Sequence, residues 1–504
     1  MKILIIFTIV FSGIFISCSS TKNKSQTKQI SFTDIASNLG EPLFVFKISK
    51  KQLENKIKIE EYNYLSSKIE EIYNSTDMLG IDLAKDVIAA GFGTNGKRVE
   101  LLISYNLNEK SDYDKEKLTN GLDKEEEING YEIYKISATG TFVLLNQNSI
   151  LFYRKLTPDN SREDIARLTE ILTTNRNECS SKIKKIIKKE NDYSLVVDTK
   201  KIVNAFPDGF SEMFFGDKEG YYHKLMADLQ IEMTLDFNDG EIISNINYHS
   251  NYIEKIDLFK DKPIEKEFLR QLSTNENISY LAANLKIENL VNFIKSDDFS
   301  VNQNIKNSKS FNDFIKWAEY MNGGFLLSFN YDQENLDSLI ADREYIPSDK
   351  VMRHQLVYNT NNADKINEMI AEEDSTYSNK FFNVANGNYA IISKSYNNYK
   401  SFLESGFINE ENKFHNNLNT PINLFWNFNS MYNMIYQIDS DKEGNDVIKM
   451  FDELKVEATK TSISTKLSFD NKKENSLQQI FDLIEQNRDK EPKREYNYSE
   501  IDNF

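Results

Sequence analysis

The chain has 504 residues, of which 61 are Lys or Arg and 78 are Asp or Glu, so its formal net charge at pH 7 is −17. This acidic balance argues against nucleic acid as a partner, because nucleic-acid binding needs a basic surface. It also disfavours purely electrostatic attachment to anionic lipid. With 33 Phe and 26 Tyr but only 7 Pro, the chain has the composition of a globular protein rather than a disordered one.

The first seventeen residues have the pattern of a bacterial lipoprotein signal peptide. Lys2 provides a positive start, and residues 3–16 are almost entirely apolar. That run is shorter than the roughly 20 residues that a membrane-spanning helix needs, but it suits a signal peptide. Ser17 and Cys18 then resemble a lipobox, although Phe15 stands where that motif usually has Leu. The resemblance implies a signal peptide over 1–17 and a lipid such as palmitate on Cys18, with ordinary secretion as the alternative.

Residues 19–29 contain no apolar side chain, so we predict a lipidated cysteine and flexible tether over 18–40. Ser19 rather than Asp follows the cysteine, which by resemblance to lipoprotein sorting rules favours the outer membrane and leaves its face open. The second cysteine, Cys179, has no partner for an intramolecular disulfide once Cys18 carries the lipid. The fold must therefore depend on its apolar core.

The rest of the chain shows two series of elements in the same order, over 41–262 and 270–490, before a polar tail at 491–504. In the first series, alternation and turn residues predict strands at 42–48, 87–93, 98–105, 131–136, 141–152, 193–198, 229–234 and 241–249, with helices from 53 onward and at 112–122, 161–189 and 253–259. The second series predicts strands at 278–285, 324–329, 353–358, 380–384, 389–394, 422–428, 454–459 and 462–469, with helices near 290–294 and at 363–372 and 476–485.

Short turns connect several of these strands, because Asn and Gly tolerate the positive φ of tight hairpins at Asn95-Gly96, Asn238-Asp239-Gly240 and Asn386-Gly387. Strands joined in this way are antiparallel. Asp-Lys-Glu-Gly also occurs in both series, at 217–220 and 441–444. We therefore predict an α+β fold made of two tandem repeats, each an antiparallel sheet with helices packed on one face. Two unrelated α+β domains with a shared order of elements are the alternative.

A family resemblance accompanies this pattern. The leader, the length, the Gly80-Ile81-Asp82-Leu83 step before a strand and the strand pair around Asn129-Gly130 resemble a large lipoprotein family of Bacteroidota. The similarity covers nearly the whole chain but includes no sharp motif. That family has no known function, so the resemblance implies a fold and a location, and no chemistry.

The string from Gly91 to Lys97 satisfies the pattern G-x-x-x-x-G-K of a phosphate-binding loop. Such a loop needs Ser or Thr after the Lys and a helix that receives the phosphate. Here Arg98 follows, and residues 98–105 read as a strand. The segment is therefore interpreted as a hairpin turn.

Asp439, Asp441 and Gly444 resemble the start of a calcium loop. The twelfth position, which should be a bidentate Glu, is Met450, and in the first series Phe215 replaces the leading Asp. A solvated turn explains both copies better than a metal site does. A weak calcium site in the second copy remains the alternative.

Other chemical motifs point to structure rather than to catalysis. Lysines flank isoleucines over 182–189, which favours a surface helix over a lipid-binding one. The four His residues show no zinc-helix spacing, and Trp317 and Trp426 lie in periodic segments typical of a core. We predict no catalytic residue, metal ligand or cofactor. The favoured function is a non-enzymatic envelope module that binds a partner protein or glycan. A periplasmic carrier of an apolar ligand and, less favoured, a glycan hydrolase are the alternatives.

Overall fold

The structure of the protein is a computed structural model. It describes residues 32–49, 52–53, 55–57, 81–82, 86–94, 98–107, 119, 122–137, 139–146, 149–155, 161–174, 178–205, 221–271, 279–296, 308–331, 352–377, 382–394, 396–405, 419–429, 432 and 448–487.

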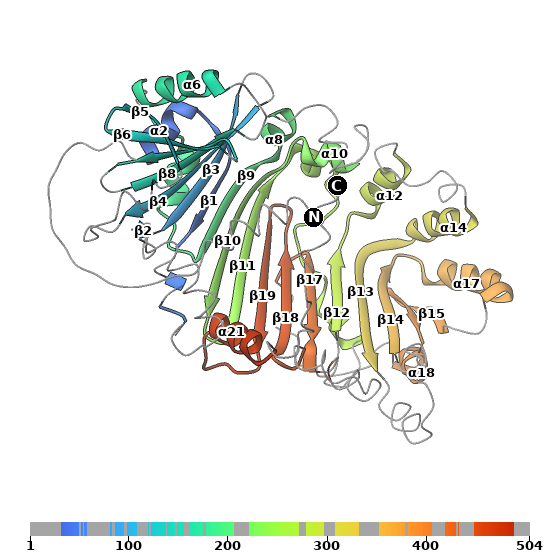
Figure 1. Ribbon diagram of the computed structural model, residues 1–504. Coiled ribbons are helices and arrows are strands. Elements are labelled where there is room, and N and C mark those ends of the chain that lie inside the picture. The colour runs from blue at the N-terminus through green and yellow to red at the C-terminus, as the bar shows by residue number, and fades with distance from the viewer. Residues whose placement is uncertain are drawn as a thin grey trace, which may run out of the picture.

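The fold is built on one large antiparallel sheet to which both halves of the chain contribute (Figure 1). The first half supplies β1 (Pro42–Ile48), β2 (Ile81–Asp82), β3 (Val87–Thr94), β4 (Arg98–Leu107), β5 (Asp123–Ile128), β6 (Tyr131–Ile136), β7 (Thr141–Leu145), β8 (Ser149–Lys155), β9 (Tyr193–Asp198), β10 (Gln230–Asn238) and β11 (Glu241–His249). The second half supplies β12 (Ser279–Asn284), β13 (Met321–Tyr331), β14 (Met352–Thr360), β15 (Phe382–Asn386), β16 (Tyr389–Ser393), β17 (Ile422–Asn427), β18 (Phe451–Ala458) and β19 (Ser462–Phe469).

The pairings run from one edge of the sheet to the other in the order β5-β6-β7-β8-β4-β3-β1-β9-β10-β11-β19-β18-β17-β12-β13-β14-β16-β15. The short β2 pairs with Asn106 and Leu107 at the end of β4, on the same side of β4 as β3. The halves meet where β11 pairs with β19, and Ser244 lies opposite Thr465 there. The separate sheets that we expected for the two halves are therefore joined into one. Each of these strands is the return strand of a hairpin, so pairing them satisfies two edges that would otherwise remain open.

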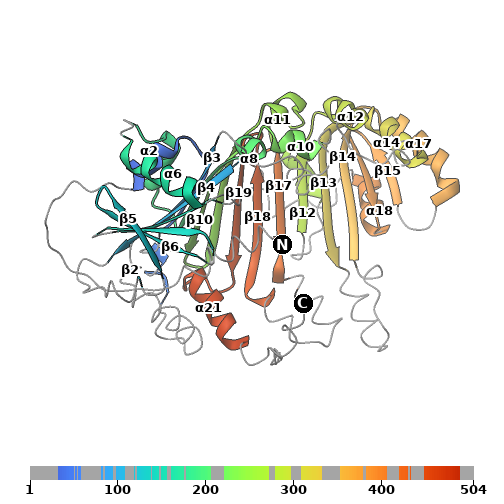
Figure 2. The same ribbon diagram turned by 45° about the horizontal axis from the view of Figure 1, so that its top comes forward.

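Helices lie along the rim and over both ends of the sheet (Figures 1 and 2). In the first half they are α2 (Phe32–Leu39), α6 (Ser161–Thr173), α7 (Ser181–Ile187), α8 (Thr199–Ala205), α10 (Tyr221–Met226) and α11 (Asn251–Ile256). The 3-10 helix η2 (Lys266–Gln271) precedes those of the second half: α12 (Ile287–Lys295), α14 (Lys309–Ala318), α17 (Ala363–Tyr377), α18 (Tyr396–Ser405) and α21 (Ser476–Asn487).

The helices pack against both faces of the sheet, which corrects the expectation of a single covered face. In the first half, α2, α6 and α7 share a buried cluster with Val45 and Leu102 on one face. On the other face, α21 contributes Leu477 and Phe481 to a cluster with Ile48. The second half repeats this arrangement, with Phe402 of α18 in one cluster and Ile366 of α17 in another. Two covered faces arise because strands in both outer parts of the sheet carry apolar residues at successive positions.

Several elements differ from the sequence prediction. The expected strand over 141–152 is instead two antiparallel strands, β7 and β8, and the Asn146 N–H donates to the Ser149 carbonyl at 3.1 Å where they are joined. The predicted tether over 18–40 is too long, since α2 begins at Phe32 and buries Ile35, Ala36 and Leu39. The hairpin turns at Asn238-Asp239-Gly240 and Asn386-Gly387 are confirmed by the pairs that flank them. The predicted helix over 112–122 and most of the one expected from 53 lie outside the described residues.

Candidate binding site

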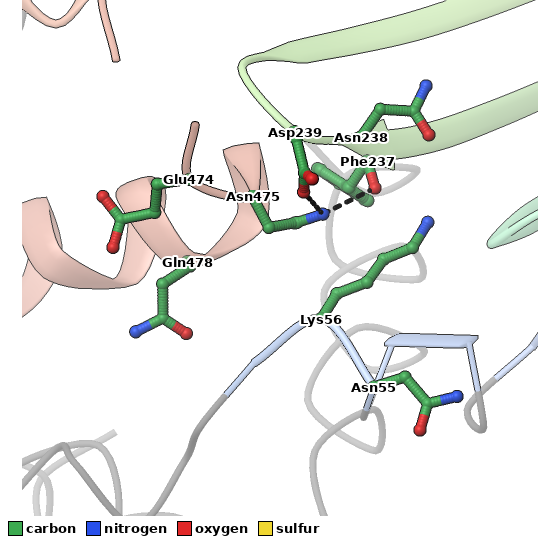
Figure 3. Close-up of a pocket in the computed structure, with 8 residues that line it drawn as sticks. All are labelled: Asn55, Lys56, Phe237, Asn238, Asp239, Glu474, Asn475 and Gln478. Atoms are coloured by element: carbon green, nitrogen blue, oxygen red, sulfur yellow. Dashed lines mark hydrogen bonds between the residues drawn. The ribbon is translucent and has the colours of Figure 1, made fainter. Parts of the chain in front are cut away.

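A cavity of about 630 Å³ lies at one end of the sheet, where the β10–β11 turn meets the start of α21 (Figure 3). Three distant parts of the chain line it: Asn55, Lys56, Phe237, Asn238, Asp239, Glu474, Asn475 and Gln478. The volume falls in the range of roughly 300–1,000 Å³ that is common for small-molecule sites. The lining is mostly polar, with four carboxamides among its eight side chains.

Asn475 holds the turn and the helix together. Its side-chain Nδ2 donates to the Phe237 carbonyl at 3.1 Å, and its Oδ1 accepts from the Leu477 backbone N–H at 3.0 Å. The second contact caps α21, because an Asn before a helix satisfies one of its free N–H groups. Gly240 also donates its N–H to the Glu474 carbonyl at 2.8 Å, at a φ of +66°. A side chain at Gly240 would meet the Lys472 backbone, which explains Gly in this turn.

The one ammonium group that lines the cavity is paired with a buried carboxylate. Lys56 Nζ lies 2.6 Å from Asp192 Oδ2, and the Asp192 side chain is 1% exposed. Asp192 Oδ2 also accepts from the Phe237 N–H at 2.6 Å. Burial raises the pKa of Asp192. Because Asp192 already neutralises Lys56, the cavity presents mainly amide and carboxylate groups, which form hydrogen bonds to a polar ligand.

The two carboxylates among the described lining residues, those of Asp239 and Glu474, do not face each other. A glycoside hydrolase needs two carboxyl groups about 5–9.5 Å apart that face the same bond. In Figure 3 the Glu474 carboxylate points away from Asp239, and Asn475 lies between them. The residues present therefore favour binding over acid–base chemistry.

A second feature is the central face of the sheet, an apolar surface that crosses the seam between the halves. A register-aligned row runs through the strands from β14 to β10: Leu356, Leu327, Leu281, Leu424, Val456, Thr465, Ser244 and Leu235. All eight residues are only partly buried. At about 4.8 Å between strands, the row is roughly 34 Å long. Neighbouring partly buried residues widen this face: Ile246, Ile463, Leu454, Leu467 and Trp426.

The opposite side of the sheet is mostly polar in the four strands nearest the junction of the halves, β10, β11, β18 and β19. Asn245 and Asn247 of β11 are exposed, whereas Ile246 between them points to the central face. Ser464 donates its hydroxyl to Asn245 across the seam at 2.8 Å. This alternation is typical of a sheet with one face toward water, so the central face is the side that should be covered.

Both edge strands are protected against pairing with another chain. β5 carries exposed Asp123 and Lys124 and three Glu residues, and such charges prevent strand addition. β15 is covered by α17, where Asn367 takes the place of a neighbouring strand. Its side chain donates to the Ala385 carbonyl at 3.0 Å and accepts from the Ala385 N–H at 2.8 Å. Binding of a partner by strand addition is therefore disfavoured at these edges.

The motifs singled out in the sequence are either structural or outside the described residues. The string at 91–98 lies in the β3–β4 hairpin, where Thr94 pairs with Arg98, so the interpretation as a turn between strands is confirmed. Cys18 and both Asp-Lys-Glu-Gly segments lie outside the described residues. No group of three metal-ligating side chains suited to a metal ion occurs in the part of the chain that the structure describes.

The lysine-rich helix is a surface helix, as the sequence indicated. In α7 the side chains of Ile183 and Ile186 are fully buried. Lys182 Nζ lies 2.9 Å from Asp198, and Lys185 Nζ lies 2.6 Å from Glu232. The lysines therefore pair with carboxylates of the sheet and balance its negative charge.

His354 is the histidine with a clear environmental shift. Burial, with a further contribution from Lys394, lowers its pKa. Its ring packs edge-on against Phe329, with centroids 5.3 Å apart. Because the folded state disfavours the charged form, His354 stabilises the fold above its unfolded pKa of about 6.5, and this stability is lost as the pH falls through the lower folded pKa.

We therefore expect His354→Gln to flatten the acid side of the stability profile. The wild type should lose stability relative to the variant between pH 7.5 and 5, as measured by urea unfolding at both values. His249, whose ring is 3.1 Å from Glu254 on the surface, provides the control, and His249→Gln should retain the wild-type loss. An equal loss in wild type and His354→Gln would contradict the assignment.

No helix in the described residues is long and apolar enough to cross a membrane. No family model matches the chain, and no curated protein matches it. Crystal forms I, III and IV of the protein TP0453 are similar to part of the chain, with identities of 14%, 12% and 13% and TM-scores of 0.25, 0.28 and 0.25. The matches cover 44%, 44% and 43% of this chain and 80%, 80% and 79% of that one. Similarity at this level supports no conclusion about fold or function.

Proposed function

We propose that this chain is a non-enzymatic interaction module of the cell envelope, anchored through a lipid on Cys18. The observation that carries this proposal is the central face. Its two end residues, Leu356 and Leu235, pack against helix-covered clusters, but the six between them, from Leu327 to Ser244, form a mostly apolar, partly buried row roughly 24 Å long. Soluble monomers rarely expose contiguous apolar patches beyond a few hundred Å², and larger ones mark interaction sites. The partner is an envelope component with a complementary apolar surface.

We further propose that the two halves, 41–262 and 270–490, are copies of one unit. The order β7-β8-β4-β3-β1-β9-β10-β11 in the first half corresponds to β15-β16-β14-β13-β12-β17-β18-β19 in the second. The two series meet head to head, with Ser244 opposite Thr465. An approximate two-fold axis through that pair would relate the two copies.

The anchor is tested by Cys18→Ala. The lipid supplies the membrane attachment, so the variant should move almost entirely from the membrane fraction to the soluble fraction after cell lysis. The measurement is immunoblotting of both fractions, with Cys179→Ala as the matched control because it leaves the lipid site intact. Retention of Cys18→Ala in the membrane would refute the anchor without affecting the central face.

The central face is tested with two neighbouring substitutions on β11. Ile246→Asp places a charge on the central face, whereas Asn247→Asp places the same charge on the polar side. Cross-linked pull-down from intact cells should recover a stoichiometric envelope partner with wild type and Asn247→Asp, and at least tenfold less of it with Ile246→Asp. Both variants should retain the wild-type circular dichroism spectrum. Equal recovery by both variants would contradict the assignment of this face.

A carrier of an apolar ligand is the second candidate, because the central face would also contact acyl chains. The cavity at the β10–β11 turn does not favour this function, since seven of its eight lining residues carry polar side chains. Organic extraction of purified protein followed by mass spectrometry distinguishes the candidates. A stoichiometric lipid that is absent from Ile246→Asp would favour the carrier, and an empty extract together with a recovered protein partner would favour the interaction module.

A further inference from the structure

An exposed group of aromatic rings lies beside β15, away from the central face. We name it the aromatic platform and define it as Phe382 of β15 with Tyr396 and Tyr399 of α18. The Phe382 ring centroid lies 5.3 Å from that of Tyr396 and 5.5 Å from that of Tyr399, and the two tyrosine centroids are 6.1 Å apart. Phe382 is 39% exposed and Tyr396 is 56% exposed.

The helix that carries the tyrosines is anchored by its other side. Phe402 of α18 is fully buried in the cluster beneath, and its carbonyl accepts a hydrogen bond from Asn386 of β15. Tyr396 and Tyr399 are three residues apart, so they share a surface of the helix, and Leu403 follows four residues after Tyr399. Leu403 is 44% exposed. The core therefore fixes α18 without needing the platform rings to be buried.

This concentration of exposed apolar side chains is unusual for the molecule. Five large apolar side chains in the described residues are strongly exposed, and three of them, Phe382, Tyr396 and Leu403, belong to this one area. Exposed aromatic rings that are held by their neighbours rather than by a core are common in binding sites, since they offer a large contact area with few rotatable bonds.

The surroundings favour a small neutral partner over a protein. A stable protein interface buries about 800 Å² on each side and involves 20–30 residues, whereas the platform has three rings and one leucine. A peptide cannot extend the sheet here, because Asn367 already occupies the backbone groups of Ala385. The nearby charged groups of Lys400 and Glu404 lie 3.8 Å apart and offset each other's charge.

We propose that the aromatic platform binds a neutral glycan. A pyranose ring has an apolar C–H face and a rim of hydroxyl groups, so it packs flat on an aromatic ring while its rim bonds to tyrosine hydroxyls and water. Tyr396 is 56% exposed, and the Tyr399 ring centroid is 6.1 Å away, close to the repeat of a β-1,4-linked chain of about 5 Å per sugar, so successive sugars are matched to the two rings. This deepens the proposed function by naming a glycan as a second partner. It depends on neither the anchor nor the central face.

The test uses the soluble Cys18→Ala chain without its signal peptide, and two probes, the hexasaccharides of β-1,4-linked N-acetylglucosamine and β-1,4-linked glucose. Isothermal titration calorimetry should show binding of at least one probe. Tyr396→Ala and Phe382→Ala should each weaken that binding at least tenfold. Phe314→Ala is the matched control, because Phe314 of α14 is an exposed aromatic residue, at 40%, outside the platform. It should bind as the wild type does.

Three outcomes would overturn the proposal. The first is that the wild type binds neither hexasaccharide. The second is that Phe314→Ala loses as much affinity as Tyr396→Ala. The third is that Leu403→Ala weakens binding most, which would indicate an aliphatic protein contact instead. Thermal melting of each variant checks folding, and a wild-type midpoint is expected since these side chains are exposed. Loss of the central-face partner would not change any of these measurements, so the two proposals can fail separately.

Discussion

Gly323→Ala should destabilise the protein by about 3 kcal/mol or more, because the backbone there is accessible only to Gly. Gly323 lies in β13 with a φ of +96°, at an irregularity in its pairing with β14. An added Cβ would lie 2.0 Å from the Leu285 carbonyl oxygen, which is backbone and cannot rotate away. The same approach supports a hydrogen bond from the Leu285 N–H to the Gly323 carbonyl at 2.8 Å. The substitution must therefore separate β13 from the end of β12.

Gly387→Ala is the matched control for this prediction. Gly387 has a φ of +59° in the β15–β16 turn, but no atom lies within 4 Å of its added Cβ. It should therefore cost only the left-handed backbone penalty of about 1–2 kcal/mol. Urea unfolding followed by circular dichroism measures both values. Equal destabilisation by the two variants would mean that backbone strain alone, and not the contact with Leu285, determines the effect.

Glu100→Ala should destabilise the protein by about 3 kcal/mol, because it removes a buried acceptor that two elements share. The Glu100 side chain is 2% exposed. Its Oε1 accepts from the Tyr153 hydroxyl at 2.9 Å and from Arg167 Nε at 3.1 Å. Without Glu100, the buried Tyr153 hydroxyl loses this acceptor, and α6 loses a charged contact with the sheet.

Glu170→Ala provides the control, since Glu170 pairs with the same Arg167 at 2.7 Å but is 57% exposed. Exposed ion pairs contribute about 0–1 kcal/mol, so this variant should be nearly as stable as the wild type. Denaturation midpoints in urea compare the two. A Glu170→Ala effect as large as that of Glu100→Ala would show that the charge of Arg167, rather than burial at Glu100, is decisive.

The strands were predictable where alternation was strong. In β11, Ile246 and Tyr248 alternate with Asn245 and Asn247, and the two apolar residues share one face as this period requires. β5 could not be predicted, because Ile128 is its only apolar residue and its pairing with β6 supplies the missing support. The pairing of β11 with β19 could not be predicted either. The sequence of each half predicts its own hairpin, β10–β11 or β18–β19, but does not indicate which strand pairs with the outer edge of that hairpin.

The cavity left little trace in the sequence. The one lining segment with a recognisable pattern is the Asn238-Asp239-Gly240 turn, and that pattern predicted a hairpin rather than a binding site. Lys56 and Gln478 come from opposite ends of the chain and meet only because α21 packs beside β10. The aromatic platform had a weak signal, in that Tyr396, Tyr399 and Leu403 follow helical spacing. That spacing is equally typical of a buried helix face, so exposure had to come from the structure.

The position of β19 and α21 has a consequence for the order in which the protein is made. The first half leaves the ribosome with its β11 edge unpaired and without Leu477 and Phe481, which complete one of its buried clusters. Both are supplied by the last part of the chain. Contacts so distant along the chain form slowly, and an open strand edge invites pairing with other chains meanwhile. Completion of the first half therefore waits for the end of synthesis, which makes its nascent form a natural client for chaperones.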